Sequence, residues 1–300
     1  MKRSRSVRAS GHRNRLPQPC AWIAEARISA RGGPLRHGQK PALLLFSVSV
    51  HRDFPANIRD RLSLLGEVRY RFARKVPAGT SSLWVFPGGY LGFDASANMW
   101  HHFNRGVYRE IEVSVLRALS RFPVHATVAL GVDSRRGPTP DSDVRQQAWV
   151  TQRHPDGCSI AKVTRGESTI RARQFSVGPL KAAFFVCGEF TGSRTEQNGP
   201  FFCDSNGNES FLTDPVAQLR DCHLLVDLAH QEVSGSLSGV CSPRMVHRLQ
   251  MKRFSRRGDA VLSHHHSGLL TDGRPHFKHQ SNWVVFRGGQ WLDASRVRPM

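Results

Sequence analysis

The sequence predicts an α/β fold with mixed sheets, and three observations lead to that fold class. Short apolar runs of strand length alternate with longer segments in which apolar residues recur every three or four positions. One Pro-Asp-Gly turn joins two strands directly as a hairpin, so the sheet is not purely parallel. No internal repeat is visible, and 300 residues with 39% hydrophobic residues suffice for one large domain.

The first half of the predicted domain contains two amphipathic helices. A strand over 42–50 precedes the first helix, which Asp53 and Pro55 introduce. A strand over 83–86, ended by Pro87-Gly88-Gly89, leads to the second helix. The expected apolar faces are Ile58, Leu62, Leu65, Phe72 and Val76 in the first helix, and Trp100, Phe103, Val107, Ile111 and Leu119 in the second.

The second half is expected to be richer in strands. After a strand over 124–132, two strands over 147–152 and 159–163 are joined by the turn His154-Pro155-Asp156-Gly157. Proline presets the first dihedral angle of such a turn, and glycine takes the positive one. The remaining predictions are strands over 181–187, 222–229, 259–265 and 283–286, and a helix around 244–257.

Charge is uneven along the chain. The formal net charge is +20, and residues 1–40 hold ten basic residues and one acidic residue. We interpret residues 1–40 as a basic, flexible N-terminal extension and residues 41–300 as the folded domain. A basic excess raises nucleic acid as a partner. Beyond residue 40, however, the arginines are spread over predicted helices and loops without a regular aromatic stripe.

Cysteine usage and hydropathy indicate a cytoplasmic protein. The six cysteines are scattered and form no Cys-x-x-Cys pair, which favours free thiols in a reducing compartment. The basic N-terminus resembles the start of a signal peptide, but Glu25 and Arg27 interrupt the apolar region that should follow. No apolar run approaches the roughly 18 residues of a membrane-spanning helix.

The strongest chemical signal is a thiol at the end of an apolar strand. Cys187 follows the run 181–186, and Gly188 allows the backbone to turn sharply after it. Ligands of open α/β sheets bind beyond the carboxyl ends of strands, so this thiol would face a crevice. Lys162 ends another predicted strand, and a lysine beside a thiol lowers its pKa. Each residue alone also fits an ordinary structural role, as a buried thiol and a solvated strand end.

The order of these segments resembles the carbon–nitrogen hydrolase (nitrilase/amidase) superfamily from about Pro41 to Trp291. The resemblance rests on the Phe-Pro turn after the second strand, the Pro-Asp-Gly hairpin that ends in Lys162, the Phe-Val-Cys-Gly-Glu segment, and the Leu-Val-x-x-Ala-His segment. The corresponding ranges are 83–89, 154–162, 185–189 and 224–230. The family implies a four-layer α-β-β-α sandwich that often pairs into dimers.

The resemblance also implies a Glu–Lys–Cys triad, which this sequence matches only in part. Cys187 corresponds to the nucleophile and Lys162 to the lysine that stabilises the tetrahedral intermediate. The family's glutamate follows the Phe-Pro pair, where this chain has Gly88. Glu189 matches an acidic position that supports the nucleophile, and Glu167 is a candidate for a second glutamate. Asp94 is a further carboxylate that could reach the site.

Other polar clusters give weaker signals. Among His264, His265 and His266, only the first and third share a strand face, and no acidic or cysteine ligand has the usual spacing, so we predict no metal site. We interpret His101-His102 as the flank of a helix. Gly88-Gly89 and Gly288-Gly289 begin no phosphate-binding pattern and are interpreted as turns.

Three functional hypotheses follow. The first is hydrolysis of a carbon–nitrogen bond in a small amide or nitrile through a Cys187 thioester, without a cofactor and in a homo-oligomer. The second is a nitrilase-like protein that is catalytically inactive because Gly88 replaces the glutamate. The third is a basic nucleic-acid-binding protein that uses residues 1–40.

Overall fold

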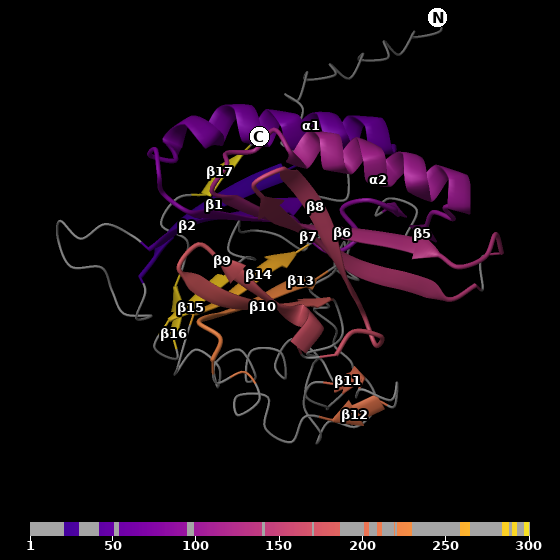
Figure 1. The fold of residues 1–300 in the computed structure, drawn as a ribbon. Helices are drawn as coiled ribbons and strands as arrows, with labels where there is room; N and C mark the ends of the chain where they lie inside the picture. Colours follow the sequence, from indigo (N-terminus) through magenta and orange to yellow (C-terminus); the bar gives the residue numbers. More distant parts are fainter. Residues whose placement is uncertain are drawn as a thin grey trace, which may run out of the picture.

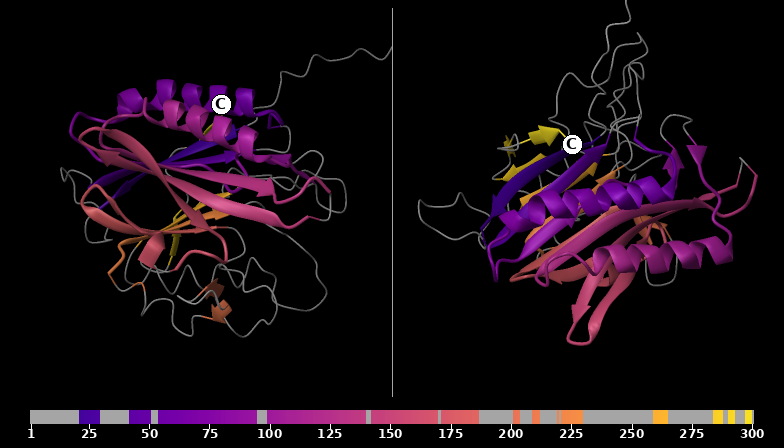
Figure 2. Two further views of the ribbon diagram at one scale, coloured as in Figure 1. Left: turned by 45° about the vertical axis from the view of Figure 1, so that its right-hand side comes forward. Right: turned by 90° about the horizontal axis from the view of Figure 1, so that it is seen from above.

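Two large β-sheets stacked face to face, with two helices over the outer face of the larger sheet, form the body of the described part of the chain (Figure 1). Figure 2 shows the helices, the larger sheet and the smaller sheet as successive layers. In this computed structural model the described residues are 21–29, 42–50, 54–94, 99–139, 142–169, 171–186, 201–203, 209–211, 219, 221–229, 259–264, 284–287, 290–292 and 297–299.

The larger sheet is parallel at its centre and antiparallel at its edges. Within the described residues its order is β17-β1-β2-β3-β6-β7-β8. β2, β3 and β6 pair in parallel, whereas β6, β7 and β8 form an antiparallel series. The bounds are β17 Val297–Pro299, β1 Ala21–Ile28, β2 Leu43–Val50, β3 Ser82–Val85, β6 Ala126–Arg135, β7 Val144–His154 and β8 Gly157–Thr164.

The smaller sheet repeats this plan. Its order in the described residues is β16-β15-β14-β13-β10-β9, with β10, β13 and β14 in parallel. Its bounds are β16 Gln290–Leu292, β15 Val284–Arg287, β14 Asp259–His264, β13 Leu224–Ala229, β10 Leu180–Val186 and β9 Gln174–Val177. Two short pairs are β4 (Phe93–Asp94) with β5 (Met99–Trp100) and β11 (Phe201–Cys203) with β12 (Glu209–Phe211).

Two helices, α1 (Ile58–Phe72) and α2 (Arg105–Leu119), lie side by side over the larger sheet (Figure 2). Each begins at an asparagine cap that satisfies a backbone N–H of the first turn. The Asn57 side chain accepts from the Asp60 N–H at 2.8 Å, and the Asn104 side chain accepts from the Val107 N–H at 3.0 Å. The 3-10 turns are η1 (Ala73–Lys75), which follows α1, and η2 (Arg171–Arg173).

The larger sheet separates two apolar cores. Its outer face packs against the helices, where Phe46 and Trp84 stack with ring centroids 4.0 Å apart. Its inner face packs against the smaller sheet, with Ala148 and Val163 in the same cluster as Phe184. Successive residues of a strand point to opposite faces, so each strand of this sheet contributes to both cores. The structure thus has the predicted α/β class with mixed sheets, and three layers of the expected sandwich lie within the described residues.

The prediction that residues 1–40 are a flexible extension is wrong for 21–28. These residues form β1, which pairs antiparallel with β2 along its whole length. Glu25 and Arg27 interrupt the apolar pattern of this segment, but charged residues are tolerated near a sheet edge when they have partners. Glu25 Oε1 lies 2.6 Å from Lys75 Nζ.

The second predicted helix starts later than expected. Trp100 lies in β5 and His102 forms an isolated bridge with Arg135, so the His101-His102 pair does not flank a helix. The helix begins after Asn104, because the asparagine caps it, and buries Ile111, Val115 and Leu119. The helix expected around 244–257 lies outside the described residues.

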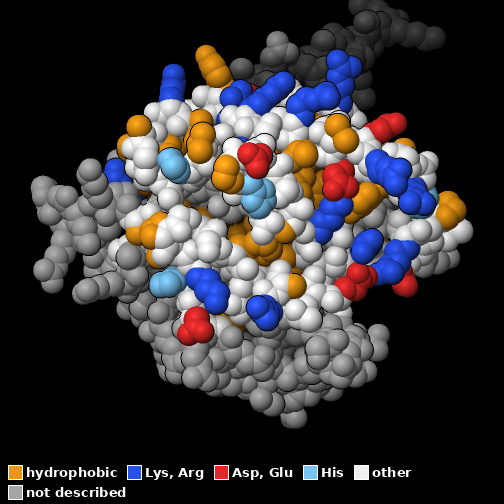
Figure 3. Space-filling model, in the orientation of Figure 1, with side chains coloured by type: hydrophobic (Ala, Val, Ile, Leu, Met, Phe, Trp, Pro, Cys, Tyr) orange, Lys and Arg blue, Asp and Glu red, His pale blue; other side chains and the backbone are white. Residues whose placement is uncertain are grey.

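Charged side chains cover the helical layer. In the space-filling view, Lys and Arg gather along the top of the molecule, over α1 and α2 (Figure 3). Within the described residues, no helix combines the length and the apolar character needed to cross a membrane.

Candidate active site

The carboxyl ends of β8 and β10 lie close together, and Arg173 marks where they meet. The Arg173 side chain is buried, and its Nη2 donates to the Thr164 carbonyl at the end of β8 at 3.4 Å. Its Nε donates to the Ser168 carbonyl at 3.0 Å. The Arg173 Cζ atom also lies 5.6 Å from the centroid of the Phe185 ring, near the end of β10. Cys187 is the next residue after β10.

The end of β3 packs tightly on β6. A Cβ on Gly131 of β6 would stand 2.1 Å from the Pro87 carbonyl oxygen and 2.5 Å from Gly88 Cα, so only glycine permits this approach. The chain then follows β6, because the Leu91 N–H donates to the Gly131 carbonyl at 3.0 Å and the Asp133 N–H to the Leu91 carbonyl at 2.8 Å. Position 88 is therefore buried beside β6.

Arg61 holds the loop that follows position 88. It is fully buried, and its Nη1 and Nη2 donate to the carbonyls of Tyr90 at 2.9 Å and Phe93 at 2.6 Å. Burial lowers the pKa of Arg61 to about 10, an effect that Tyr90 and Asp94 oppose. Sequence analysis missed this arginine, although it lies three residues after Ile58 and four before Leu65 on the apolar face of α1.

Lys162 points toward the helices. Its Nζ lies 2.8 Å from Glu112 Oε2 of α2 and about 5 Å from two aromatic rings, 5.0 Å from Tyr108 and 4.9 Å from Trp149. The neighbouring Val163 faces the smaller sheet, to which β10 belongs. The expected role of Lys162 beside a thiol at the end of β10 conflicts with this placement, because its ammonium lies on the opposite face of the larger sheet.

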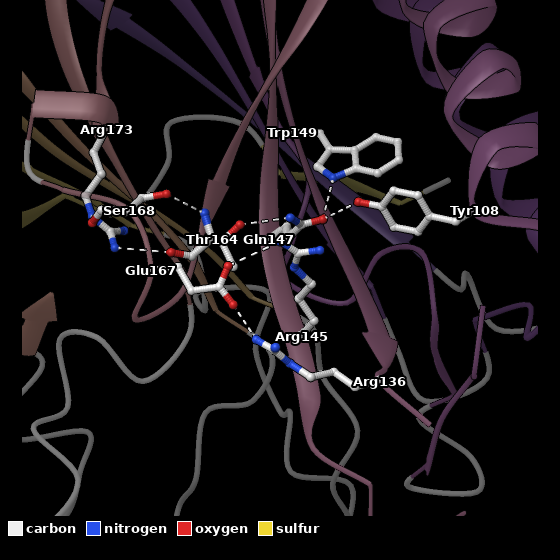
Figure 4. A network of polar contacts seen from close by, with 9 residues as sticks. All are labelled: Tyr108, Arg136, Arg145, Gln147, Trp149, Thr164, Glu167, Ser168 and Arg173. Carbon is white, nitrogen blue, oxygen red and sulfur yellow. Dashed lines mark hydrogen bonds and ion pairs between the residues drawn. The ribbon is translucent and has the colours of Figure 1, made fainter. Parts of the chain in front are cut away.

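A hydrogen-bond network on this outer face ends at β8 (Figure 4). Gln147 Oε1 accepts from the Tyr108 hydroxyl at 2.5 Å and from Trp149 Nε1 at 3.1 Å, and Gln147 Nε2 donates to Thr164 Oγ1 at 2.8 Å. Burial raises the pKa of Tyr108, so its hydroxyl stays a donor at neutral pH. The network fixes the end of β8 to α2.

Glu167 lies just beyond β8 at the surface. Its side chain is 41% exposed, and its two oxygens are held by Arg136 and by Arg145, the latter at 3.2 Å (Figure 4). Its predicted role as a second glutamate is not supported by a contact with the inner face. Cys187 and Glu189 lie outside the described residues, so their roles stay predictions. Asp94 ends β4 and is half-buried.

The inner face carries a polar row that sequence analysis did not find. Asp133 of β6 is paired directly with Gln146 of β7, and the Arg165 N–H donates to the Gln146 carbonyl at 2.9 Å. By strand alternation these three residues face the smaller sheet, as Ala129, Ala148 and Val163 do. Arg165 Nη1 donates to Gln146 Oε1 at 2.5 Å, and Trp100 Nε1 donates to Asp133 Oδ2 at 3.0 Å.

The remaining histidines show no metal arrangement within the described residues, where no group of three His, Cys, Asp or Glu side chains could hold an ion. His264 ends β14, and His265 and His266 lie outside the described residues. His101 lies beyond β5, and burial lowers its pKa, with Arg61 adding to that effect.

Comparison with solved structures agrees with this architecture. The chain is similar to a mutant of the amidase from Nesterenkonia sp. AN1 with the acetamide moiety of fluoroacetamide covalently added at the active site cysteine. That match has 13% identity and a TM-score of 0.50, and it covers 89% of this chain and 93% of the other. A carbon–nitrogen hydrolase from Helicobacter pylori G27 matches at 11% identity and a TM-score of 0.48, over 83% and 85% of the two chains.

The first of these likenesses shows the fold, which is that of the Nesterenkonia amidase. No protein-family model matches the sequence, and no curated protein matches it.

Proposed function

We propose that the protein hydrolyses a carbon–nitrogen bond of a small amide or nitrile, with Cys187 as the nucleophile. The observation that carries the proposal is the meeting of two strand ends, because β10 leads directly to Cys187 and ends beside β8 at Arg173. β10 is buried along its length except at Lys181. A thiol that follows such a strand begins at the edge where α/β folds bind ligands.

For an amide, the reaction proceeds in two halves. The thiolate adds to the carbonyl carbon, and the carbonyl oxygen becomes an oxyanion. The carbon–nitrogen bond then breaks, and the nitrogen takes a proton and leaves as ammonia or an amine. Water adds to the resulting thioester, and the carboxylic acid departs with return of the thiol. Covalent catalysis of this kind splits one difficult step into two easier ones.

Arg165 is the cation that we assign to the oxyanion, in place of Lys162. It follows Val163 by two residues, so it shares the inner face with the residues that pack against β10. A guanidinium has a fixed fork of donors and stays charged at neutral pH, which suits stabilisation of a developing negative charge. Glu189, two residues beyond the thiol, keeps its expected supporting role in the proposal.

Gly88 favours a second candidate, a protein with this fold and no turnover. Position 88 is buried against β6 and has no carboxylate to move a proton. General acid–base catalysis contributes roughly 10²- to 10⁴-fold to a rate, so its loss alone would leave a very slow enzyme.

The reactivity of the Cys187 thiol distinguishes the two candidate functions from a protein in which this cysteine is unreactive. Wild type and Cys187→Ala would be treated with chloroacetamide at neutral pH, followed by peptide mapping and by ammonia release from acetamide, propionamide and acetonitrile. We expect selective alkylation of Cys187 and loss of ammonia release in the variant. Cys222 is the internal control, because burial raises the pKa of its thiol.

Each outcome decides between the proposals. Equal alkylation of all six cysteines would contradict an activated nucleophile. Selective alkylation without ammonia release would favour the inactive protein, and Gly88→Glu would then be expected to create turnover. The small amide or nitrile partner and the homo-oligomer remain part of the proposal, and light scattering of the full chain would test the oligomer.

A further inference from the structure

Position 88 has no carboxylate, but the adjacent strand β6 carries one beside it. β3 pairs with β6 in parallel, and the Pro87-Gly88 segment lies against Gly131. Asp133 is two residues farther along β6, so it shares the inner face with Gly131 and lies one step beyond the glycine contact. The chain after position 88 stays beside it, since the Asp133 N–H donates to the Leu91 carbonyl at 2.8 Å.

We propose that Asp133 is the general base of this site and performs from β6 the proton transfers that residue 88 cannot perform. This inference rests on the proposed function, because it assigns Asp133 to the Cys187 reaction. Asp133 takes the proton of the Cys187 thiol as the sulfur attacks the carbonyl carbon. It returns that proton to the nitrogen as the carbon–nitrogen bond breaks. In the second half it takes a proton from the attacking water and returns it to the sulfur.

Burial and hydrogen bonding favour a structured carboxylate at this point. Asp133 is fully buried, and its Oδ2 accepts from Trp100 Nε1 at 3.0 Å. Trp100 itself packs against Phe93, with ring centroids 4.9 Å apart, so the loop after position 88 fixes the donor. A buried carboxylate needs such partners, because desolvation of a charge is costly.

The base and the proposed oxyanion cation belong to one cross-strand row. Directly opposite residues on one face of an antiparallel pair have Cβ atoms about 4.5–5.5 Å apart, and Asp133 and Gln146 are such a pair. Arg165 donates to the Gln146 side chain at 2.5 Å. Gln146 therefore separates a proton acceptor from a cation, an arrangement that fits the sulfur on one side of an amide carbonyl and its oxygen on the other.

The test is the pH dependence of Cys187 alkylation in wild type and Asp133→Asn, with Asp143→Asn as the control. Asp143 is exposed and lies in the connection between β6 and β7, directly before β7 begins. Chloroacetamide is the probe, and site-resolved rates are measured from pH 6 upward. We expect Asp133→Asn to slow alkylation at neutral pH at least about tenfold and ammonia release by roughly 10²-fold. The rates should converge at alkaline pH, where the thiol ionises without a base.

The other charged groups near Asp133 are the same in Asp133→Asn and in Asp143→Asn. A difference between the pH profiles of Cys187 alkylation in these two variants is therefore due to Asp133. These other groups are Arg61 of α1, Asp94 of β4, His101 beyond β5, Arg135 of β6 and Arg165 beyond β8.

Trp100→Phe is the second variant, for the case that Asp133→Asn does not fold. It keeps a ring against Phe93 and removes the donor to Asp133. Without this donor the carboxylate loses a partner that fixes its position, so we expect slower Cys187 alkylation at neutral pH than in wild type. Selective Cys187 alkylation with wild-type profiles in both variants would overturn the inference and leave the proposed function standing. An unreactive Cys187 in wild type would overturn the proposed function itself.

Discussion

The outer and inner faces of the β7–β8 hairpin each carry a cation, and the two have different surroundings. On the outer face, Lys162 has an ion pair with Glu112 and two aromatic neighbours. On the inner face, Arg165 bonds to Gln146, which is paired with Asp133. The residues are three positions apart, so strand alternation sends them to opposite faces. The face, and not the residue type, decides which cation can serve a site between the sheets.

Arg61 extends this comparison to the loop after β3. It is a fully buried cation on the helical side, and its guanidinium donates to the backbone carbonyls of the loop while its Cζ lies 4.8 Å from the centroid of the Phe54 ring. Its role is to hold the 89–93 segment in place. Cations on the helical side therefore stabilise the structure, whereas we assign the chemistry to the inner face.

The largest expected effect is on stability, from Arg61→Met. The variant leaves the carbonyls of Gly89, Tyr90 and Phe93 without their donor, and each unsatisfied buried group costs about 1–3 kcal/mol. We expect the free energy of unfolding to fall by about 3 kcal/mol or more, measured by urea denaturation. Arg59→Met, an exposed arginine of the same helix, is the control and should change it by less than about 0.5 kcal/mol. Equal effects would contradict the structural role of Arg61.

Much of the fold follows from local sequence patterns. The Pro-Asp-Gly hairpin is confirmed, with Gly157 at φ 149°, because turn chemistry acts within a few residues. The first helix is confirmed by its apolar spacing, although Asn57 and not Asp53 caps it and it ends at Phe72, before Val76. β1 was not predicted because the charge of Glu25 is balanced by Lys75, which is fifty residues away in sequence. A local sequence pattern cannot show a partner at that distance.

The site was harder to predict because it depends on strand faces and register. β8 is mostly half-buried on both faces, so its sequence shows no alternation that would assign Lys162 or Arg165 to one side. The Asp133–Gln146 pairing depends on the register across the β6–β7 connection, which periodicity does not determine. Cys187 could be singled out from sequence because an apolar strand precedes it directly.

Arg165→Met tests the inner face. Removal of one donor from an oxyanion site typically costs roughly 10²- to 10³-fold in rate, and we expect ammonia release to fall about 10²-fold. Stability should change little, because Arg165 is only half-buried. Arg171→Met, an exposed arginine of η2, is the matched control and should keep the wild-type rate. Retention of full activity by Arg165→Met would remove Arg165 from the proposed reaction.

The smallest effect is expected on the outer face, from Lys162→Met. Lys162 and Glu112 are 28% and 38% exposed, so water screens their ion pair. A double-mutant cycle with Glu112→Gln should give a coupling free energy of about 0.5 kcal/mol, which decreases in 1 M salt because the Debye length falls to about 3 Å. Ammonia release should stay within about twofold of wild type, since the ammonium lies across the sheet from β10. Loss of turnover in Lys162→Met, as expected for Cys187→Ala, would contradict this assignment. The chemistry would then belong to Lys162 and not to the inner face, and β8 would have to rearrange for the lysine to reach the thiol.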